Sequence, residues 1–490
     1  MTIRTFTEAA GLAPGYDLVV IGAGPAGLAA AVEAAAAGVS VLVLDEGAGP
    51  GGQMYRALPR LDPEVFAFLG PDYWQGKALV RAFLDSGASY APQAVVWGLE
   101  AAAEPPGLEV AVSLGGASRA LRARRVLLAT GAHERPMPFP GWTLPGVMLA
   151  GAAQIALKSS GLVPAGRVVL AGSGPLLYLL AEELLGAGAE ITALLDTTSP
   201  GRWLRALPHL PGFLASQYFL KGLRMFMKVR TAVRTWRNVD GLAASGDGRV
   251  QRLRFRRRGR WRELDADLVL VHQGVVPDIN LPGAVGCALE WNPRQCAFQP
   301  RVDPSGRTTV PGLSVAGDAA VVRGAALAEA SGRLTALDAL MALGVLAPEE
   351  AAMRQDALRR TCRSLARGRA FLDTLYLPRA AFRVPADDDT VVCRCEEVRA
   401  GQIRSAIALG APGVNQVKTF LRCGMGPCQG RMCAATVTEM VAAERRACPE
   451  QVGTFRTRVP VKPVTLAEMA SIPATPEALI AVTGEATPLD

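Results

Sequence analysis

The stretch YDLVVIGAGPAGLAAAVEAAAAGVSVLVLDEG, residues 16–47, decides the fold class of this 490-residue chain. An apolar strand (18–21) runs into Gly22-x-Gly24-x-x-Gly27, and an alanine-rich helix and a second strand follow. In such a unit the first glycine makes the tight turn, the second admits a pyrophosphate to the backbone, and the third lets the helix pack on the strand. The pyrophosphate then sits at the positive N-terminus of the helix.

The second strand of this unit ends at Asp45 and Glu46. Asp45 follows directly after the strand and is therefore placed to accept hydrogen bonds from an adenosine ribose. We assign nucleotide binding to the three glycines together with Pro25, Ala26, Asp45 and Glu46. The motif contacts only the ADP half of a ligand, so it does not distinguish FAD from NAD or ATP.

Three further segments favour FAD. They are RRVLLATGAHERP (124–136) with Thr130 and Gly131, VPGLSVAGDAA (310–320) with Gly317 and Asp318, and GAGPGGQ (47–53) with Gly52 and Gln53. This combination resembles the two-dinucleotide-domain flavoproteins, the superfamily that includes thioredoxin and glutathione reductases. In that superfamily the aspartate of the glycine–aspartate box meets the ribitol hydroxyls of the flavin. The alternative for Asp318 is a helix N-cap that binds no ligand.

A second strand–turn–helix unit, GRVVLAGSGPLLYLLAEELLGAGAEITALLD, spans residues 166–196. Gly172 and Gly174 are present, but Leu177 stands at the third glycine position. A helix without that glycine cannot come as close to the strand, which impairs the cradle for a second pyrophosphate. We therefore expect a structural domain, with NAD(P)H binding as the alternative. No C-x-x-C occurs in the chain, which argues against a thioredoxin reductase.

Composition places the chain among well-folded globular proteins, because half of its residues are apolar and a fifth are charged. The N-terminus has no apolar signal-peptide core, and the longest uncharged stretch, Pro136 to Leu157, carries four prolines and is no membrane span. We expect a cytoplasmic protein without a transmembrane segment. Cysteines in that compartment are metal ligands or redox groups more often than disulfides.

The net charge of +8 is concentrated in RLRFRRRGRWR, residues 252–262, which holds seven arginines. Leu253 and Phe255 alternate with arginines, a pattern that predicts a half-exposed hairpin. A solvated hairpin is the first interpretation and an anionic docking face the second. We expect no nucleic-acid binding, since no recognition motif accompanies the patch.

Five of the nine cysteines fall within residues 393–433. Cys393 and Cys395 form a C-x-C pair, and Cys423, Cys428 and Cys433 follow about thirty residues later. Ile403, Ile407 and Leu409 predict a short amphipathic helix between the two groups, Val414 and Val417 predict the start of a second, and an apolar helix follows the last cysteine. The spacing fits four thiolates around a [2Fe–2S] cluster, with structural zinc or an empty relic as alternatives. The scattered Cys287, Cys296, Cys362 and Cys448 are expected to be buried.

The cysteine module resembles the bacterioferritin-associated-ferredoxin-like [2Fe–2S] domain, in which C-x-C, just over thirty residues, a cysteine pair and a helix follow one another. In that register the metal ligands are Cys393, Cys395, Cys428 and Cys433, and Cys423 is a spare. The register that uses Cys423 with Cys428 is the alternative.

The chain as a whole resembles the large (alpha or A) subunits of bacterial amine and amino-acid dehydrogenases: opine oxidases, D-hydroxyproline dehydrogenase, hydrogen cyanide synthase and heteromeric sarcosine oxidase. The resemblance rests on DLVVIGAGPAGLAAA, DEGAGPGGQMYR, TGAHERPMPFPGWTLPGVMLAGAAQ, GSGPLL, AGDAA, CRCEEV, GMGPCQGRMC and RTRVPVKPVTLAEMA. It implies an FAD and iron–sulfur subunit that relays electrons from a D-amino-acid-oxidase-like partner, with FMN where the subunits meet and room for a small third subunit. The implied substrate is an opine, D-hydroxyproline or another secondary or N-substituted amino acid. A self-sufficient NAD(P)H-dependent reductase and a non-enzymatic iron–sulfur scaffold are the alternatives.

The expected fold class is α/β, a two-dinucleotide-binding-domain (Rossmann-like) flavoprotein with a small helical C-terminal iron–sulfur domain. Its parts are a discontinuous FAD-binding domain (1–160 and 275–345), a second dinucleotide-like domain (161–274), a helical linker (346–388), the iron–sulfur domain (389–448) and an extended tail (449–490). The tail is expected to wrap a partner or to pack on its own chain. No catalytic residue stands out among the side chains, and His133 is either a nucleotide-cavity residue or an ordinary loop histidine.

Overall fold

The structure is a computed structural model that describes residues 2–102 and 107–473. Its first sheet has the order β1-β4-β3-β2-β7-β6-β5, with β20 paired to β7. These strands are β1 (Arg4–Thr5), β2 (Gly15–Ile21), β3 (Val41–Asp45), β4 (Ser89–Pro92), β5 (Val95–Ala102), β6 (Gly107–Leu114), β7 (Ala117–Leu128) and β20 (Leu313–Val315). The central strands are parallel, and β5, β6 and β7 are antiparallel.

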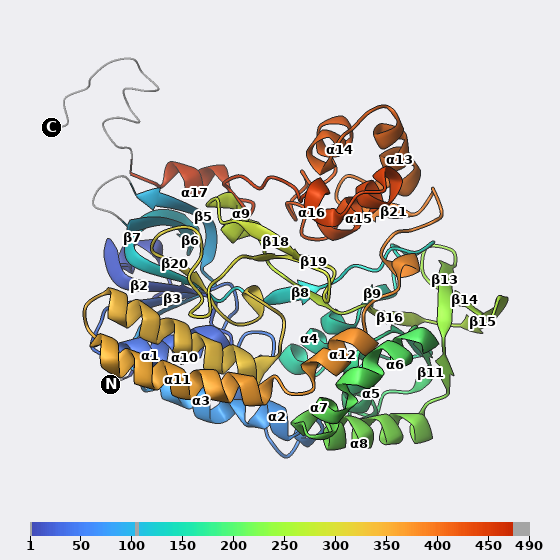
Figure 1. Ribbon diagram of the computed structural model, residues 1–490, viewed down its shortest axis with the longest axis horizontal. Coiled ribbons are helices and arrows are strands. Elements are labelled where there is room, and N and C mark those ends of the chain that lie inside the picture. The colour runs from blue at the N-terminus through green and yellow to red at the C-terminus, as the bar shows by residue number, and fades with distance from the viewer. Residues whose placement is uncertain (1, 103–106, 474–490) are drawn as a thin grey trace.

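Three helices cover one side of this sheet. Helix α1 (Pro25–Ala36) packs against α10 (Ala325–Ala342), and α10 packs against α11 (Pro348–Leu365), as Figure 1 shows. Because α10 and β20 return to the first sheet from residues beyond 310, the first domain is discontinuous in sequence. The buried strands consist of nearly continuous Val, Leu and Ile, the composition of a parallel sheet covered on both faces.

The second sheet is fully parallel, with the order β12-β11-β10-β16-β9. Its strands are β9 (Val147–Leu149), β10 (Val168–Gly172), β11 (Ile191–Asp196), β12 (Thr235–Arg237) and β16 (Leu268–His272), and its helices are α4 (Ala150–Ser160), α5 (Pro175–Gly186), α6 (Pro200–Ala206), α7 (Leu210–Leu214) and α8 (Gln217–Ala232). This domain begins earlier than residue 161, because β9 pairs with β16 and α4 packs on both strands. The basic hairpin forms β14 (Arg252–Arg257) and β15 (Arg260–Asp265) beside β13 (Val239–Ser245), and Leu253 and Phe255 are buried as predicted.

Two short strand pairs lie between the domains. Strands β8 (Ala132–Glu134) and β17 (Val275–Pro277) pair in an antiparallel way, and β18 (Leu289–Asn292) pairs with β19 (Ala297–Pro300) near α9 (Asn280–Ala284). The linker forms α11 and α12 (Arg369–Leu375), so it contains two helices.

The C-terminal module stands above β8 in Figure 1. It consists of β21 (Val391–Cys393), β22 (Val398–Arg399), α13 (Ala400–Ala408), α14 (Val414–Leu421), α15 (Ala434–Arg445) and α16 (Pro449–Val452) around its own core. Helix α15 begins directly after Cys433, as predicted. Leu409 lies outside α13 and is exposed, so its inclusion in the amphipathic pattern was wrong.

The described part of the tail packs against this same chain. Val461 is buried and its N–H donates to the carbonyl oxygen of Trp97, while α17 (Leu466–Ala470) lies against the first sheet (Figure 1). The hydroxyl of Ser471 accepts a hydrogen bond from the N–H of Ser118. These contacts favour the self-packed interpretation for residues up to 473.

Across the described ranges, no helix combines the length and apolar character that crossing a bilayer requires. Among the scattered cysteines, Cys287 and Cys296 are buried as expected, Cys362 is half-buried, and Cys448 is exposed. The expectation was therefore wrong for Cys448, which caps the short helix α16 at the surface.

Candidate functional site

In the first glycine-rich turn, Gly22 and Gly27 lie against neighbouring backbone, and Gly24 faces open space. Gly22 has a φ of +109°, and a Cβ there would lie 2.3 Å from the carbonyl oxygen of Ala129. A Cβ on Gly27 would lie 1.8 Å from the carbonyl oxygen of Gly22, so helix and strand touch at this point. A Cβ on Gly24 would meet nothing closer than the Cα of Gly52 at 4.0 Å. Gly24 therefore faces open space at the N-terminus of α1, where a pyrophosphate would bind.

Asp45 braces this turn from the end of β3. Its carboxylate accepts hydrogen bonds from the N–H groups of Ala23 (2.5 Å) and Gly47 (2.6 Å). Burial raises the pKa of Asp45, and the two backbone donors act against that rise. Because a carboxylate has about four acceptor positions, two remain for ribose hydroxyls. Glu46 is instead paired with Lys462 of the tail at 2.7 Å, a contact that the sequence did not predict.

The other predicted nucleotide residues gather around the same turn. Gly52 lies against Gly24, and Gly51 donates its N–H to the carbonyl oxygen of Ala23. The buried hydroxyl of Thr130 has no hydrogen-bond partner in the described structure, and a Cβ on Gly131 would meet no atom within 4 Å. Buried polar groups without a partner are rare, so the Thr130 hydroxyl is a feature that a bound ligand would satisfy.

Gln53 is exposed, and its side-chain oxygen accepts a hydrogen bond from Arg56. It therefore contributes less to the cradle than Gly52 does.

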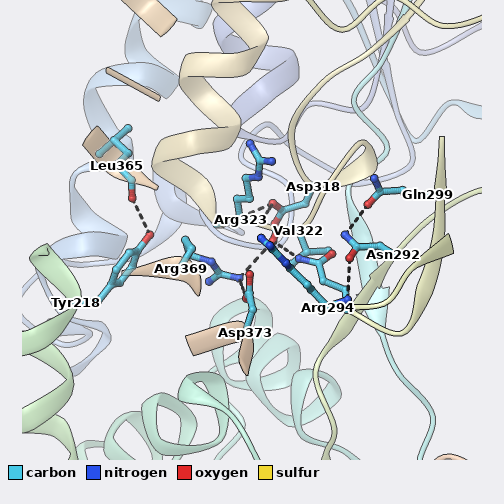
Figure 2. Close-up of polar contacts among 12 residues, drawn as sticks. Tyr218, Asn292, Arg294, Gln299, Asp318, Val322, Arg323, Leu365, Arg369 and Asp373 are labelled. Carbon is cyan, nitrogen blue, oxygen red and sulfur yellow. Dashed lines mark hydrogen bonds and ion pairs between the residues drawn. The ribbon is translucent and has the colours of Figure 1, made fainter. Parts of the chain in front are cut away.

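Asp318 lies beside the N-terminus of α10. One of its oxygens accepts hydrogen bonds from the N–H groups of Arg323 (2.7 Å) and Gly324 (3.0 Å), and burial raises its pKa. Asp318 is not the N-cap of α10, which is Gly324, but its carboxylate accepts from the two N–H groups directly before the helix. The second carboxylate oxygen has no described hydrogen bond. Figure 2 shows the linker residue Arg369 against the same loop, where it donates to the carbonyl oxygen of Val322 and to Asp373.

The cysteines of the C-terminal module form a buried trio and a more exposed pair. The sulfur atoms of Cys393, Cys423 and Cys433 all lie within 4.8 Å of one another, and those of Cys423 and Cys433 are 3.9 Å apart. Cys395 is exposed, and its thiol is hydrogen-bonded to that of Cys428. Hydrogen bonds from Cys423 and Cys433 lower the pKa of Cys393, so a thiolate is favoured there.

The structure therefore brings two of the predicted ligands, Cys393 and Cys433, together with Cys423, and it pairs the other two, Cys395 and Cys428, with each other. The buried trio alone offers three of the four thiolates that a [2Fe–2S] cluster needs. A buried trio of thiols fits a soft metal site, since thiolates select iron–sulfur clusters or zinc.

Side chains of this chain make hydrogen bonds beside the second glycine-rich turn. Leu177 is buried at the third glycine position, and the hydroxyl of the neighbouring Tyr178 donates to Asp196 at 2.9 Å. Arg379 of the linker donates to the carbonyl oxygen of Thr197 at 2.6 Å, at the carboxyl end of β11. Ligands of open α/β sheets bind outside the carboxyl ends of the strands, so these contacts lie at the edge of the sheet where a second nucleotide would bind.

Two histidines have contacts that the sequence did not reveal. His133 lies in β8, and its Nε2 is 3.0 Å from the carbonyl oxygen of Arg431, so it faces the cysteine module and is not an ordinary loop histidine. His272 is buried, with Nδ1 at 2.5 Å from Glu134, whose other oxygen accepts the N–H of Gly151 at 2.6 Å. No sequence signal links the two histidines to these partners, because more than a hundred residues separate each histidine from its partner.

Comparison with known proteins agrees with this geometry. Residues 16–334 match the pyridine nucleotide-disulphide oxidoreductase family, and residues 388–472 match the sarcosine oxidase A3 domain. The chain is 51% identical over 487 residues to the A subunit of the opine oxidase of Rhizobium meliloti, covering 99% of this chain and 93% of that protein. It is 34% identical to the HcnB subunit of the hydrogen cyanide synthase of Pseudomonas aeruginosa, covering 91% and 96% of the two chains.

The solved structure of L-proline dehydrogenase from P. horikoshii has the same fold, with a TM-score of 0.70 at 20% identity over 96% of this chain and 80% of that one. A thioredoxin reductase from T. acidophilum covers 68% of this chain with a TM-score of 0.51. The chain therefore belongs to the family of large subunits of the bacterial amine and amino-acid dehydrogenases, and it is an oxidoreductase subunit built on the pyridine nucleotide-disulphide oxidoreductase fold.

Proposed function

We propose that this chain is the FAD- and iron–sulfur-containing relay subunit of a heteromeric dehydrogenase that oxidises a secondary or N-substituted amino acid, such as an opine or D-hydroxyproline. The amine is oxidised by a D-amino-acid-oxidase-like partner, and FMN lies where the two subunits meet, with a small third subunit completing the assembly. The observation that carries the proposal is the buried trio of cysteine thiols in a module whose cysteine loop is hydrogen-bonded to His133 of β8, directly after the nucleotide-site residues Thr130 and Gly131.

The residues present fit both an FAD and a [2Fe–2S] cluster. Gly22, Gly24 and Asp45 would hold the pyrophosphate and ribose of FAD, and Thr130 and Asp318 would meet its flavin half. The unpartnered Thr130 hydroxyl and the open face of Gly24 support this assignment. Cys393, Cys395, Cys428 and Cys433 would ligate the cluster. A bound flavin and a bound [2Fe–2S] cluster together supply two-electron chemistry on one side and one-electron chemistry on the other.

Amine oxidation is assigned to a partner because the histidines of this chain are committed elsewhere. Of the three, His133 donates to a backbone carbonyl oxygen, His272 is held by Glu134, and His209 is exposed on the second domain. Within the described residues, no hydrogen bond joins any of the three imidazoles to a serine, threonine, cysteine or lysine side chain. The chain binds and positions its cofactors, and a proton acceptor for an amine substrate has to come from the partner.

The hydrogen-bonded side chains beside the second glycine-rich turn support a relay over a self-sufficient NAD(P)H-dependent reductase. Tyr178 and Arg379 take hydrogen bonds that a nucleotide would need there. NADPH should therefore leave the bound flavin of the lone chain oxidised, and stoichiometric bleaching would favour the reductase instead. We assign the protein to the cytoplasm, because a thiol cluster of this kind needs a reducing compartment.

The deciding experiment is to express this chain alone and together with the product of its neighbouring gene. Dye reduction is then assayed with a panel of opines, D-hydroxyproline and other secondary amino acids. We expect reduction only when both chains are present. Full activity from the lone chain would contradict the relay model and would place the catalytic site in this chain, around Gly131 and His133.

A further inference from the structure

The loop that carries the last two predicted ligands, residues 428–433, rests on the first domain through directed hydrogen bonds. Nε2 of His133 donates to the carbonyl oxygen of Arg431 at 3.0 Å, which requires the proton to be on Nε2. The side-chain amide of Asn280, a buried residue, donates to the carbonyl oxygen of Gln429 at 3.0 Å. His133 lies in β8 and Asn280 at the start of α9, so both donors come from outside the C-terminal module.

The guanidinium of Arg431 connects its own loop to two further segments. Its Nε donates to the carboxylate of Asp278 at 3.1 Å, and its Nη1 donates to the carbonyl oxygens of Cys428 and Val461, each at 3.2 Å. The side chains of Arg431 and Asp278 are only 14% and 21% exposed. A charge-assisted pair in such a site is stronger and more directional than one on the surface.

A second buried ion pair fixes the helix that follows the cysteines. Glu439 on α15 pairs with Arg383 of the linker and lies 3.9 Å from Arg135, and all three side chains are largely buried. Arg135 also donates to the carbonyl oxygens of Gln295 and Cys296. Because α15 begins directly after Cys433, this contact restrains the module from the other side of the loop.

The same short strands reach the nucleotide site. Strand β8 begins at Ala132, one residue after Gly131, and His133 is its next residue. Asp278 donates its N–H to the carbonyl oxygen of Gly131 at 3.2 Å while its carboxylate holds Arg431. The backbone N–H of Asp278, directly after β17, thus contacts the predicted flavin loop, while the side chains of His133 and Asp278 contact the cysteine loop.

From this arrangement we infer that His133, Asp278 and Arg431 are positioning residues that hold the cysteine loop at a fixed place relative to the nucleotide site. The iron–sulfur module is then a fixed relay and not a domain that swings between two docking positions. This inference rests on the proposed function only for the identity of the cluster. Its physical basis is that a loop held by several directed hydrogen bonds, one of them a charge-assisted pair, keeps one position relative to its neighbours.

The test is amide hydrogen exchange of the full-length protein, followed by mass spectrometry, with iron counted in the same samples. Asp278→Asn removes the charge on the partner of Arg431 without changing its size, and Asp247→Asn, in an exposed bend, is the matched control. We expect amides of residues 428–433 to exchange at least tenfold faster in Asp278→Asn than in the control. His133→Leu should behave in the same way, and His133→Gln, which keeps a donor, should restore most of the protection.

Exchange rates in Asp278→Asn and His133→Leu that equal those of the control would overturn the inference. Absence of iron from the unchanged protein would instead overturn the proposed cluster. The two failures are distinguishable, because the exchange of this loop is measured whether or not iron is bound.

Discussion

The most direct test of the nucleotide site is Gly24→Val. Gly24 has an ordinary φ of −78°, and a Cβ there meets only the Cα of Gly52 at 4.0 Å, so the folded protein has room for the side chain. The new side chain instead occupies the space in front of α1, where the pyrophosphate of a dinucleotide would lie. Loss of ligand should therefore be separable from loss of fold.

The expected magnitude follows from the hydrogen bonds that the ligand loses. A hydrogen bond to a charged group contributes ~1.5–3 kcal/mol, so displacing the pyrophosphate from two backbone N–H groups costs ~3–6 kcal/mol. At ~1.4 kcal/mol per factor of ten, FAD affinity should fall by about 10²- to 10⁴-fold. The cost to folding stability should be near ~1 kcal/mol, the usual effect of replacing a favourable N-cap residue by an apolar one.

The assay combines FAD content per chain by chromatography, a binding titration and thermal unfolding. Gly201→Val is the neutral control, because a Cβ on Gly201 meets no atom within 4 Å and the residue is exposed. Gly27→Ala is the opposite control, because its Cβ would lie 1.8 Å from the carbonyl oxygen of Gly22. That overlap should destabilise the fold by about 3 kcal/mol, the upper end of overpacking effects.

A Gly24→Val protein that keeps one FAD per chain with an unchanged affinity would refute the assignment of this turn. Recovery of ATP or NAD in place of FAD from the unchanged protein would correct the cofactor and leave the pyrophosphate cradle in place.

Three other outcomes are expected. Asp45→Ala should weaken nucleotide binding by ~1.5–3 kcal/mol and also lower the melting temperature, since its carboxylate supports two backbone N–H groups of the turn; equal binding would remove it from the site. Anaerobic purification should yield about two irons and two sulfides per chain. Cys428→Ser should abolish this iron and sulfide content, and Cys423→Ser should leave it largely intact. Loss of iron in the Cys423 variant would mean that the buried trio supplies ligands. Burial raises the pKa of Asp278, but the charges of Arg431 and His133 and the hydrogen bonds from Asn280 and Arg431 together outweigh burial, so the net pKa is lowered. Above the pKa of about 4 that Asp278 has in the unfolded chain, the ion pair therefore contributes its full stabilisation to the fold, and this contribution is lost as pH falls through the lowered pKa of Asp278 in the folded protein. In acid titrations by circular dichroism, Asp278→Asn should therefore lose less stability below about pH 4 than the unchanged protein does.

Several features of the fold were predictable because they depend on neighbours in the chain. The turn from Gly22 to Gly27 and the strand that ends at Asp45 require only local backbone geometry, and the structure forms both as expected. The start of α15 after Cys433 was predictable for the same reason. The impaired second cradle that Leu177 indicates stays a prediction, and the contacts of Tyr178 and Arg379 beside that turn are known only from the structure.

Other features depended on which surfaces of distant segments meet. The sequence motifs treated Cys423 as a spare, and tertiary packing brings its sulfur to 3.9 Å from that of Cys433. The boundary between the two dinucleotide-like domains was placed too late in the chain, since the pairing of β9 with β16 is a contact between residues over a hundred positions apart.

The amino-acid sequence by itself determined the chemistry that the chain carries: one intact dinucleotide turn, one degraded turn and five clustered thiols. Only the tertiary structure decided how these parts face each other. Arg431 and Asp278 are 153 residues apart, and no local pattern marks either as the other's partner. Their ion pair exists because the C-terminal module and the tail pack on the segment that holds Asp278 and partly bury both charges, and a buried charge is stable only when an opposite charge or hydrogen bonds compensate it.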